Sequence, residues 1–427
     1  MSNTTKNTTM KKNGKTALVP KLRFPEFRGK EGWEEKPLAN FLSESRLPGS
    51  KGNVAKKITV KLWGNGVFEK NDAIQGSINT QYYRRKAGQF IYSKLDFLNQ
   101  AFGIIPPSLD NFESTVDLPC FDIVDGLNPV FLLEYVKRRD FYEKLGETAD
   151  GSRKARRIHA DTFLSFPIAL PSPAEQQKIA ECLSSMDELM AAQARKVEAL
   201  KTHKKGLMQQ LFPREGETQP RLRFPEFQDS GEWKQVRLDG FSRVIRGSSP
   251  RPQGDPRFFG GPVPRLMVQD VTRDGKWVTP SIDSLTEEGA TLSRPCPAGT
   301  LTIVCSGVVG IVSFLAVDAC IHDGFLALVD IDESKANKDF LFHTLSTLRS
   351  QFERGATHGG VFTNLTTQGI KEFVIHCPEI GEQQRIADCL TSLDELITAE
   401  AQKLEALKTH KKGLMQQLFP SPGEVEA

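Results

Sequence analysis

The feature that most constrains the fold of this chain is that its sequence contains the same pattern twice. The hexapeptide LRFPEF occurs at residues 22–27 and again at 222–227, and a tryptophan follows each copy six residues later. A longer match pairs residues 174–213 with residues 381–420, where 30 of 40 aligned positions are identical. Such self-similarity indicates an internal duplication, so we expect two halves related by a pseudo-two-fold axis.

The two middle segments, about 35–165 and 235–370, share little sequence with each other. Both alternate short β-type runs with Gly, Pro and Asn, while 131–145 and 340–352 have a helical pattern. We therefore expect each middle segment to form an α+β domain with a twisted mixed sheet. The runs expected to be strands include 58–63, 89–92, 301–305, 311–317 and 325–331.

The repeated 40-residue segments predict two long helices, each with a narrow apolar seam. Two heptad positions, four residues apart, are apolar at eight of ten sites in each copy. Lys204 and Lys411 interrupt the pattern at equivalent places. The seam residues are Ile179, Leu183, Met186, Leu200 and Leu207 in the first helix and Ile386, Leu390, Leu393, Leu407 and Leu414 in the second.

Local signals place the ends of these helices. Ser172 is expected to be the N-cap of the first helix, Pro173 its first residue and Glu175 the carboxylate of a capping box. Pro213 and Pro420 end the two helices, because proline cannot continue a helix. The second helix begins near Pro378 without an equivalent serine.

The direction of pairing follows from the interrupting lysines. A parallel, in-register pair would place Lys204 against Lys411, which is unfavourable, so we expect antiparallel pairing with residues 22–27 near the C-terminal end of the second helix. The fold class is then α+β, with two globular domains separated by an antiparallel two-helix coiled coil. A coiled-coil arm joining two chains is the alternative, although a partner within the chain has a much higher effective concentration.

These expectations divide the chain into six parts. They are a disordered tail at 1–20, a first globular domain at 21–170, a central helix at 171–213, a second globular domain at 214–376, a distal helix at 377–420 and a tail at 421–427.

The charge pattern suggests DNA as a partner. The chain has 56 Lys+Arg and 53 Asp+Glu, which argues against a histone-like protein but allows local basic surfaces. Basic residues gather in Gly/Ser-containing loops of both middle segments, where they can neutralise phosphates or contact guanine, although any single cluster can equally be a solvated loop. The candidate DNA contacts are Lys56, Lys57, Arg84, Arg85, Lys86, Arg153, Lys154, Arg156, Arg157, Arg246, Ser248, Ser249, Arg251, Thr357, His358 and Asn364.

Other classes of protein are not supported by the sequence. No stretch resembles a membrane span or a signal peptide, and seven cysteines without a CxxC pair suit reduced thiols, so a cytoplasmic protein is expected. The chain contains no GxxxxGK[ST], no GxGxxG and no PD dipeptide. We therefore expect no catalytic residues, no metal site and no cofactor in this chain.

The repeated motifs resemble those of the specificity subunits of type I restriction-modification enzymes. The resemblance rests on LRFPEF with its following tryptophan, on the proline-led EQQ helix starts at 173–179 and 378–386, and on the helix ends with KKGLMQQLF. It covers about residues 20–420. The second middle segment is also similar to the family at 246–261 and 297–310, whereas the first matches less well.

The resemblance implies a non-catalytic DNA-recognition subunit that acts in phage defence. The middle segments would be two target recognition domains, each binding one half of a split double-stranded DNA sequence, and the helices would space them and dock two methyltransferase subunits. Two restriction/translocase subunits would join for cleavage. S-adenosylmethionine, ATP and Mg²⁺ would be bound by those partners. We further expect the length of the unrecognised spacer to follow the length of the helices.

Two other functions are compatible with parts of the pattern. A scaffold protein whose divergent middle segments bind proteins would show no salt-dependent DNA binding. A stand-alone nuclease or methyltransferase would act without partner subunits, which the missing motifs disfavour.

Overall fold

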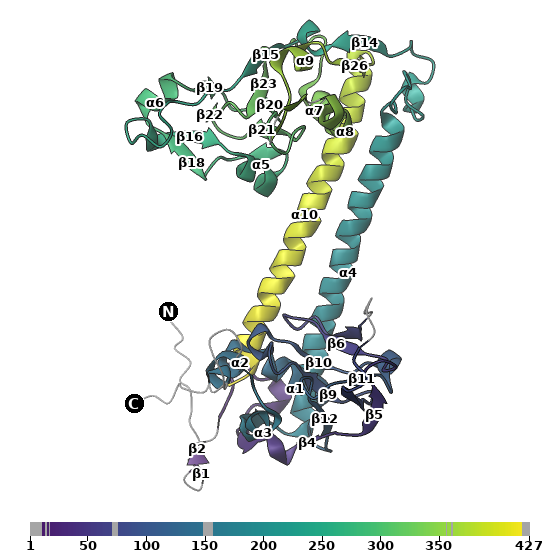
Figure 1. Ribbon diagram of the computed structural model, residues 1–427, viewed down its shortest axis with the longest axis vertical. Coiled ribbons are helices and arrows are strands. Elements are labelled where there is room, and N and C mark those ends of the chain that lie inside the picture. The colour runs from purple at the N-terminus through teal and green to yellow at the C-terminus, as the bar shows by residue number, and fades with distance from the viewer. Residues whose placement is uncertain are drawn as a thin grey trace. The chain divides into compact units, whose positions relative to one another are not determined.

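The computed structural model describes residues 11–12, 15–16, 18–70, 76–147, 157–355, 357–359 and 362–420, with side chains from residue 18 onward except at 355–364. The chain divides into two compact units (Figure 1). The first unit comprises Met1–Ala194 and Gln402–Ala427, and the second comprises Arg195–Ala401. The division falls inside two long helices, α4 (Pro173–Leu211) and α10 (Ile380–Leu418), so each unit contains one end of each helix.

The ends of the helices show that α4 and α10 pair antiparallel within one chain. In the first unit Leu183, near the start of α4, shares a core with Leu418 at the end of α10. In the second unit Leu211, at the end of α4, shares a core with Leu390 near the start of α10. The predicted internal, antiparallel pairing is therefore confirmed.

The first unit carries the first middle segment, in which two small sheets lie beside the start of α4. Within the described residues the strand order is β10-β9-β12-β4 in one sheet and β11-β8-β5 in the other, and β6 pairs with β7 as a hairpin. The elements are β1 (Lys11–Lys12), β2 (Lys15–Thr16), β3 (Glu34–Pro37), β4 (Leu42–Glu44), β5 (Pro48–Lys51), β6 (Ile58–Val60), β7 (Val67–Glu69), β8 (Gln81–Arg84), β9 (Phe90–Tyr92), β10 (Phe102–Ile104), β11 (Glu113–Ser114), β12 (Cys120–Ile123), α1 (Pro129–Val136), α2 (Arg139–Gly146), α3 (Ala160–Ser165) and β13 (Pro167–Leu170).

The second unit carries the second middle segment, which has larger sheets. Within the described residues the strand order is β15-β23-β20-β21-β17 in one sheet and β18-β16-β22-β19 in the other. The elements are β14 (Lys234–Arg237), β15 (Arg243–Arg246), β16 (Phe259–Leu266), α5 (Val268–Asp274), β17 (Trp277–Val278), β18 (Asp283–Leu285), α6 (Glu287–Thr291), β19 (Arg294–Cys296), β20 (Leu301–Val304), β21 (Val312–Leu315), β22 (Ala319–Ile321), β23 (Phe325–Val329), α7 (Lys338–Thr347), α8 (Arg349–Gly355), β24 (Thr357–Gly359), β25 (Phe362–Asn364), α9 (Thr367–Lys371) and β26 (Val374–Cys377).

Each helical stretch expected in a middle segment is broken in two. The stretch 131–145 forms α1 and α2, which are separated at Lys137 and Arg138, and Arg138 has extended backbone at the start of α2. The stretch 340–352 forms α7 and α8, separated at Leu348. The expected strands at 58–63, 89–92, 301–305, 311–317 and 325–331 are confirmed as β6, β9, β20, β21 and β23, each shorter than its run.

The repeated hexapeptide is held against α4 in the first unit and against α10 in the second by equivalent ion pairs. The Arg23 guanidinium donates to both Glu175 oxygens, at 2.7 and 2.6 Å, and Arg223 donates to Glu382 at 2.9 and 2.5 Å. Both carboxylates are almost fully buried. The expected capping-box role of Glu175 is therefore wrong, because its carboxylate bonds the hexapeptide arginine, while Ser172 does accept from the Glu175 backbone N–H.

The backbone of each hexapeptide also meets the end of the other helix of its unit. The Leu22 N–H donates to the Gln417 carbonyl at 2.9 Å, and the Leu222 N–H donates to the Gln210 carbonyl at 3.0 Å. These hydrogen bonds satisfy carbonyl groups that lack partners in the last turn of a helix. The predicted docking of residues 22–27 at the C-terminal end of the second helix is confirmed.

The two glutamines of each EQQ sequence bind the asparagine that caps the helix beside them. Gln176 accepts from the Asn128 backbone N–H at 3.0 Å, and Gln177 accepts from the Asn128 side-chain amide at 2.7 Å. Gln383 and Gln384 make the same two bonds to Asn337. The capping asparagine in turn accepts from the first turn of α1 or α7. The repeat thus fixes one helix of each middle segment against the long helices.

An aromatic cluster completes the scaffold in both units. Trp33 lies 5.7 Å from Phe131 and 6.0 Å from Phe419 between ring centroids. Trp233 lies 5.9 Å from Phe340 and 6.5 Å from Phe212. Trp33 and Trp233 are almost fully buried. Each tryptophan therefore joins the end of a long helix to α1 in the first unit or to α7 in the second, which explains its fixed distance from the hexapeptide.

The seam residues pack as the heptad pattern predicts. Ile179, Leu183, Ile386 and Leu390 are fully buried, and Met186, Leu200, Leu207, Leu393, Leu407 and Leu414 are half-buried. The interrupting lysines face carboxylates of their own unit: Lys204 binds Asp394 at 2.5 Å, and Lys411 binds Asp187 at 2.8 Å.

An ordered contact precedes residue 21, since Trp33 N–H donates to the Leu18 carbonyl, so the tail expected at 1–20 ends earlier.

Candidate nucleic-acid interface

In the first unit, two of the predicted basic segments meet around strand β11. Arg84 pairs with Glu113 in the β8–β11 ladder, and the Glu113 N–H donates to the Lys56 carbonyl at 2.7 Å. The Glu113 carboxylate is buried and accepts from the Ser50 backbone and hydroxyl, at 2.8 and 3.0 Å. Lys56 and Arg84 are both exposed, and both contact Glu113 of β11 through the backbone. Exposed basic side chains of this kind can bind phosphates.

Arg85 was predicted to contact DNA, and the structure corrects this prediction. Its side chain is only 2% exposed. The guanidinium donates to the Ser114 hydroxyl at 2.8 Å and to the Ser45 carbonyl at 2.7 Å, so it stabilises the ends of three strands from inside. Burial lowers the pKa of Arg85 from its usual value. Arg84 and Arg85 look equally suited to DNA contact in the sequence, because strand alternation at a basic pair does not show which residue faces inward.

The remaining first-unit candidates differ in their surroundings. Lys57 is mostly buried, with its ammonium 5.9 Å from the Tyr82 ring centroid, and is therefore not a surface lysine. Lys86 is exposed and donates to the Asn111 side chain at 2.7 Å. Arg157 is exposed and lies 3.3 Å from Asp117. The predicted contacts Arg153, Lys154 and Arg156 lie outside the described residues.

In the second unit, the loop after β15 is held by hydrogen bonds to three other segments. The Ser249 hydroxyl donates to Asp323 at 2.6 Å and accepts from Arg265 at 2.8 Å. The Ser248 hydroxyl donates to the Leu292 carbonyl at 3.1 Å. Both predicted serines therefore have structural partners already, and they fix the loop that carries Arg251.

Arg246 and Arg251 are the two predicted contacts that this loop presents. Arg246 is half-buried and donates through Nε to the Asp323 carbonyl at 3.0 Å. Arg251 is exposed, with its guanidinium 3.8 Å from the Asp323 carboxylate. The hydrogen bond from Ser249 lowers the pKa of Asp323, against the effect of burial. Asp323 thus stays ionised beside Arg251, while its backbone carbonyl holds Arg246.

A buried arginine holds the same loop, and a half-buried histidine lies near it. Arg265 binds Asp283 at 2.5 Å and is buried, while its Nε has no hydrogen-bond partner among the described residues. Burial and the nearby Arg265 charge lower the pKa of His322, so His322 is neutral at neutral pH. The loop after β15 is a preorganised surface, held by groups that sequence inspection did not connect.

The other predicted segment of the second unit, residues 357–364, forms a hairpin. In the backbone, Thr357 pairs with Asn364 and His358 with Thr363 across β24 and β25. The side chains of Thr357, His358 and Asn364 lie outside the described residues. Their role as base contacts stays a prediction.

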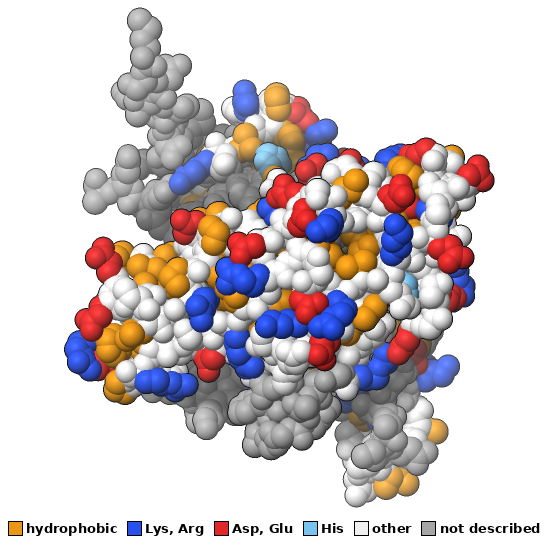
Figure 2. Space-filling view, turned by 90° about the horizontal axis from the view of Figure 1, so that it is seen from above, with side chains coloured by type: hydrophobic (Ala, Val, Ile, Leu, Met, Phe, Trp, Pro, Cys, Tyr) orange, Lys and Arg blue, Asp and Glu red, His pale blue; other side chains and the backbone are white. Residues whose placement is uncertain are grey.

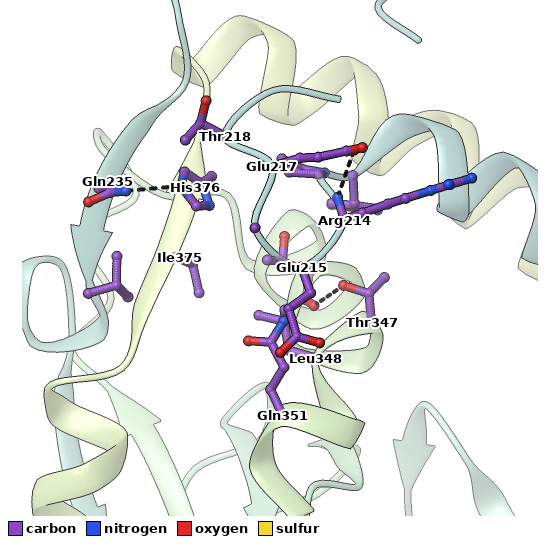
Figure 3. A pocket seen from close by; sticks show the side chains of 15 residues that line it. Arg214, Glu215, Glu217, Thr218, Gln235, Thr347, Leu348, Gln351, Ile375 and His376 are labelled. Atoms are coloured by element: carbon purple, nitrogen blue, oxygen red, sulfur yellow. Dashed lines mark hydrogen bonds between the residues drawn. The ribbon is translucent and has the colours of Figure 1, made fainter. Parts of the chain in front are cut away.

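The described surface mixes charges of both signs, and a cavity lies after the end of α4. On the face seen in Figure 2, Lys and Arg side chains lie among Asp and Glu side chains. A cavity of about 200 Å³ after the end of α4 is lined by side chains such as Arg214, Glu217, Gln235 and His376 (Figure 3). Among the described residues, no group of three or more His, Cys, Asp and Glu side chains is arranged to hold a metal ion.

No helix in the described part of the chain is both long enough and apolar enough to span a membrane. The two long helices, α4 and α10, carry charged residues throughout.

Comparison with known proteins agrees with this architecture. Residues 231–409 match the family model of the type I restriction modification DNA specificity domain. Residues 231–409 therefore carry the sequence features of that domain family. The resemblance of LRFPEF, EQQ and KKGLMQQLF to the type I specificity subunits is thereby confirmed.

Two curated relatives of this chain come from Methanocaldococcus jannaschii. The putative MjaX specificity subunit is 25% identical over 300 residues, which are 68% of this chain and 66% of that protein. The MjaVIII specificity subunit is 25% identical over 276 residues, or 60% of this chain and 62% of that protein. The chain thus spans slightly less than two thirds of the length of these relatives.

Two solved structures share the fold of this chain. A chain from a type I restriction-modification system shows a TM-score of 0.57 at 17% identity, covering 91% of this chain and 98% of that chain. The S subunit from M. genitalium shows a TM-score of 0.55 at 15% identity, covering 95% and 100%. These similarities confirm the α+β class with two domains and paired long helices.

Proposed function

We propose that this specificity subunit recognises a bipartite, asymmetric DNA sequence, one half through each middle segment. The observation that carries the proposal is that an identical scaffold supports two different middle segments. Arg23–Glu175 and Arg223–Glu382 anchor both copies in the same way, while the sheets and basic loops beyond them differ. Equal anchoring with unequal binding surfaces suits two unlike half-sites.

The chain carries no chemistry of its own in this proposal. Two methyltransferase subunits would dock on the long helices, and two restriction/translocase subunits would join them. S-adenosylmethionine, ATP and Mg²⁺ would be bound by those partner subunits. Exposed lysines and glutamates along α4 and α10 offer polar docking surfaces.

Replacement of one middle segment tests this proposal. Residues 235–370 are exchanged for the corresponding segment of another specificity subunit, with the repeated flanks kept, and adenine methylation is mapped in cells that hold the methyltransferase. We expect one half of the methylated sequence to change and the other half to stay. An exchange that alters both halves, or neither, contradicts the assignment of one half-site to each middle segment.

A further inference from the structure

An exposed tryptophan lies at the tip of the β6–β7 hairpin in the first unit. Trp63 is 62% exposed, and its neighbours Leu62 and Phe68 are 39% and 45% exposed. The other tryptophans pack on aromatic rings; even Trp277, at 52% exposure, lies 4.8 Å from the Phe314 ring. A large apolar side chain in water is unfavourable, so a group of such residues at one tip marks a contact surface.

The backbone holds Trp63 in a conformation that a bulky residue rarely adopts. Its φ angle is +59°, in the left-handed region, and Gln100 opposite has φ +53°. The Trp63 N–H donates to the Asn99 carbonyl at 2.7 Å, and the Gly64 N–H donates to the Gln100 carbonyl at 2.9 Å. A positive φ at tryptophan is strained, and such strain persists where the surrounding structure enforces it, commonly at ligand-binding sites.

The base of the hairpin is rigid. Ile58, Val60 and Val67 are buried in one apolar cluster with Ile91 and Ala101 of the neighbouring sheet. The tip is therefore a fixed projection, and its side chains need little ordering when a partner binds.

The charges around the hairpin favour DNA as that partner. Residues 51–68 contain four lysines and no acidic residue. Lys56 and Lys61 are exposed, and the Lys61 ammonium lies 4.1 Å from the Phe68 ring centroid. Lysine is depleted at the centres of protein–protein interfaces, whereas it is typical of surfaces that bind phosphates.

We propose that the hairpin tip is an apolar wedge, with Trp63 packing against bases and sugars in a DNA groove while Lys56 and Lys61 contact phosphates. Apolar side chains that enter a groove in this way stabilise the bound duplex and favour sequences that deform easily. This inference rests on the proposed function, because it adds Trp63 to the residues of the first middle segment that contact DNA.

The test measures DNA binding by the full chain in complex with its methyltransferase subunits. Fluorescence anisotropy gives the Kd for a labelled duplex carrying the methylated sequence, at several salt concentrations. The main variant is Trp63→Asn, because asparagine tolerates a positive φ and removes the aromatic ring. Val54→Asn is the matched control, since Val54 is an exposed apolar residue of the same segment, at 70% exposure, outside the hairpin.

The proposal predicts a specific pattern of results. Trp63→Asn weakens binding about ten- to a hundredfold with an unchanged salt dependence, while Trp63→Phe keeps most of the affinity. Lys61→Ala lowers the slope of log K against log salt by about one, as loss of one phosphate contact does. Val54→Asn binds like the unmodified chain.

Two results would contradict the proposed DNA contact of Trp63 and leave the proposed function intact. One is Trp63→Asn binding the cognate duplex as tightly as the unmodified chain. The other is loss of methyltransferase binding by Trp63→Asn, which would make the tip a protein contact. If the unmodified complex shows no preference for its methylated sequence, the proposed function itself fails, and the wedge fails with it.

Discussion

At the scale of single residues, the fate of a charged side chain depends on tertiary contacts. Arg84 and Arg85 are adjacent and chemically identical, yet Arg84 is exposed and Arg85 is enclosed by Ser45 and Ser114. Those acceptors lie 40 and 29 positions away in the sequence, so no local pattern could predict the burial. Trp63 was missed for a related reason, because an exposed and a buried tryptophan look alike in a sequence.

Glu134 offers a test of a buried charge in the first unit. Its carboxylate lies 2.9 Å from Lys137 and 3.0 Å from Lys411. Burial acts to raise the pKa of Glu134, but the two lysines outweigh it and lower the pKa below its usual value. Glu134→Gln should therefore destabilise the first unit by about 2–4 kcal/mol at neutral pH, because Lys411 loses a buried partner.

The pH dependence of that loss follows from the direction of the pKa shift. A carboxyl whose folded pKa is lowered contributes stability above its unfolded pKa, and this contribution disappears as pH falls through the folded pKa. Urea unfolding of the two proteins should differ at neutral pH and converge below about pH 4. Glu143→Gln, an exposed glutamate of α2, is the control and should cost little. A difference that persists undiminished in acid would contradict the role of the ion pairs.

The second unit has a histidine where the first has this glutamate. Aligning the capping residues Asn128 and Asn337 places His343 opposite Glu134. His343 is fully buried, and burial together with Lys204 and Lys276 lowers its pKa to about 3. The two units therefore differ in charge at an equivalent position, close to the interrupting lysine of the helix.

At the scale of elements, the sequence predicted the scaffold better than the middle segments. The helices expected at 171–213 and 377–420 are observed as α4 and α10, because heptad periodicity and proline stops act locally. The helical stretches in the middle segments were each found broken, since packing in a small domain overrides propensity. The bonding partners of the repeated residues could not be predicted from the sequence, because residues such as Arg23 and Glu175 meet only in the folded chain.

The Arg23–Glu175 pair should hold the first hexapeptide against α4. Arg23→Ala should destabilise the first unit by about 3–5 kcal/mol, because it leaves the Glu175 carboxylate buried without its partner. The combined change Arg23→Met and Glu175→Leu should recover most of this loss, since it removes both charges. Denaturant unfolding measures both values, and Lys30→Ala, at an exposed site nearby, serves as control. Equal losses in the single and double variants would show that the ion pair is not the cause.

The capping asparagines test the equivalence of the repeats. Asn128→Ala and Asn337→Ala should each cost about 1–2 kcal/mol, because each removes an N-cap and a hydrogen bond to a glutamine of the EQQ sequence. Thermal unfolding of both variants should show similar losses in the two units. A loss in one variant alone would mean that the repeated contacts are not equivalent in energy.

At the scale of the whole molecule, the proposed function gives the duplication a purpose, because two equivalent scaffolds would let one chain bind two unlike DNA sequences. The anchoring residues Arg23 and Glu175 make the same contact as Arg223 and Glu382, whereas the middle segments form different sheets. Selection can then alter one middle segment without disturbing the anchoring of the other. The exchange of residues 235–370 described above depends on this independence.

The central claim is that this chain determines which DNA sequence a type I system recognises, and one measurement tests it most directly. Adenine methylation is mapped across the genome of cells carrying the chain with its methyltransferase and of cells lacking only the chain. The account predicts a split, asymmetric methylated sequence that disappears in the deletion. An unchanged methylation map in a system with active methyltransferase would contradict it.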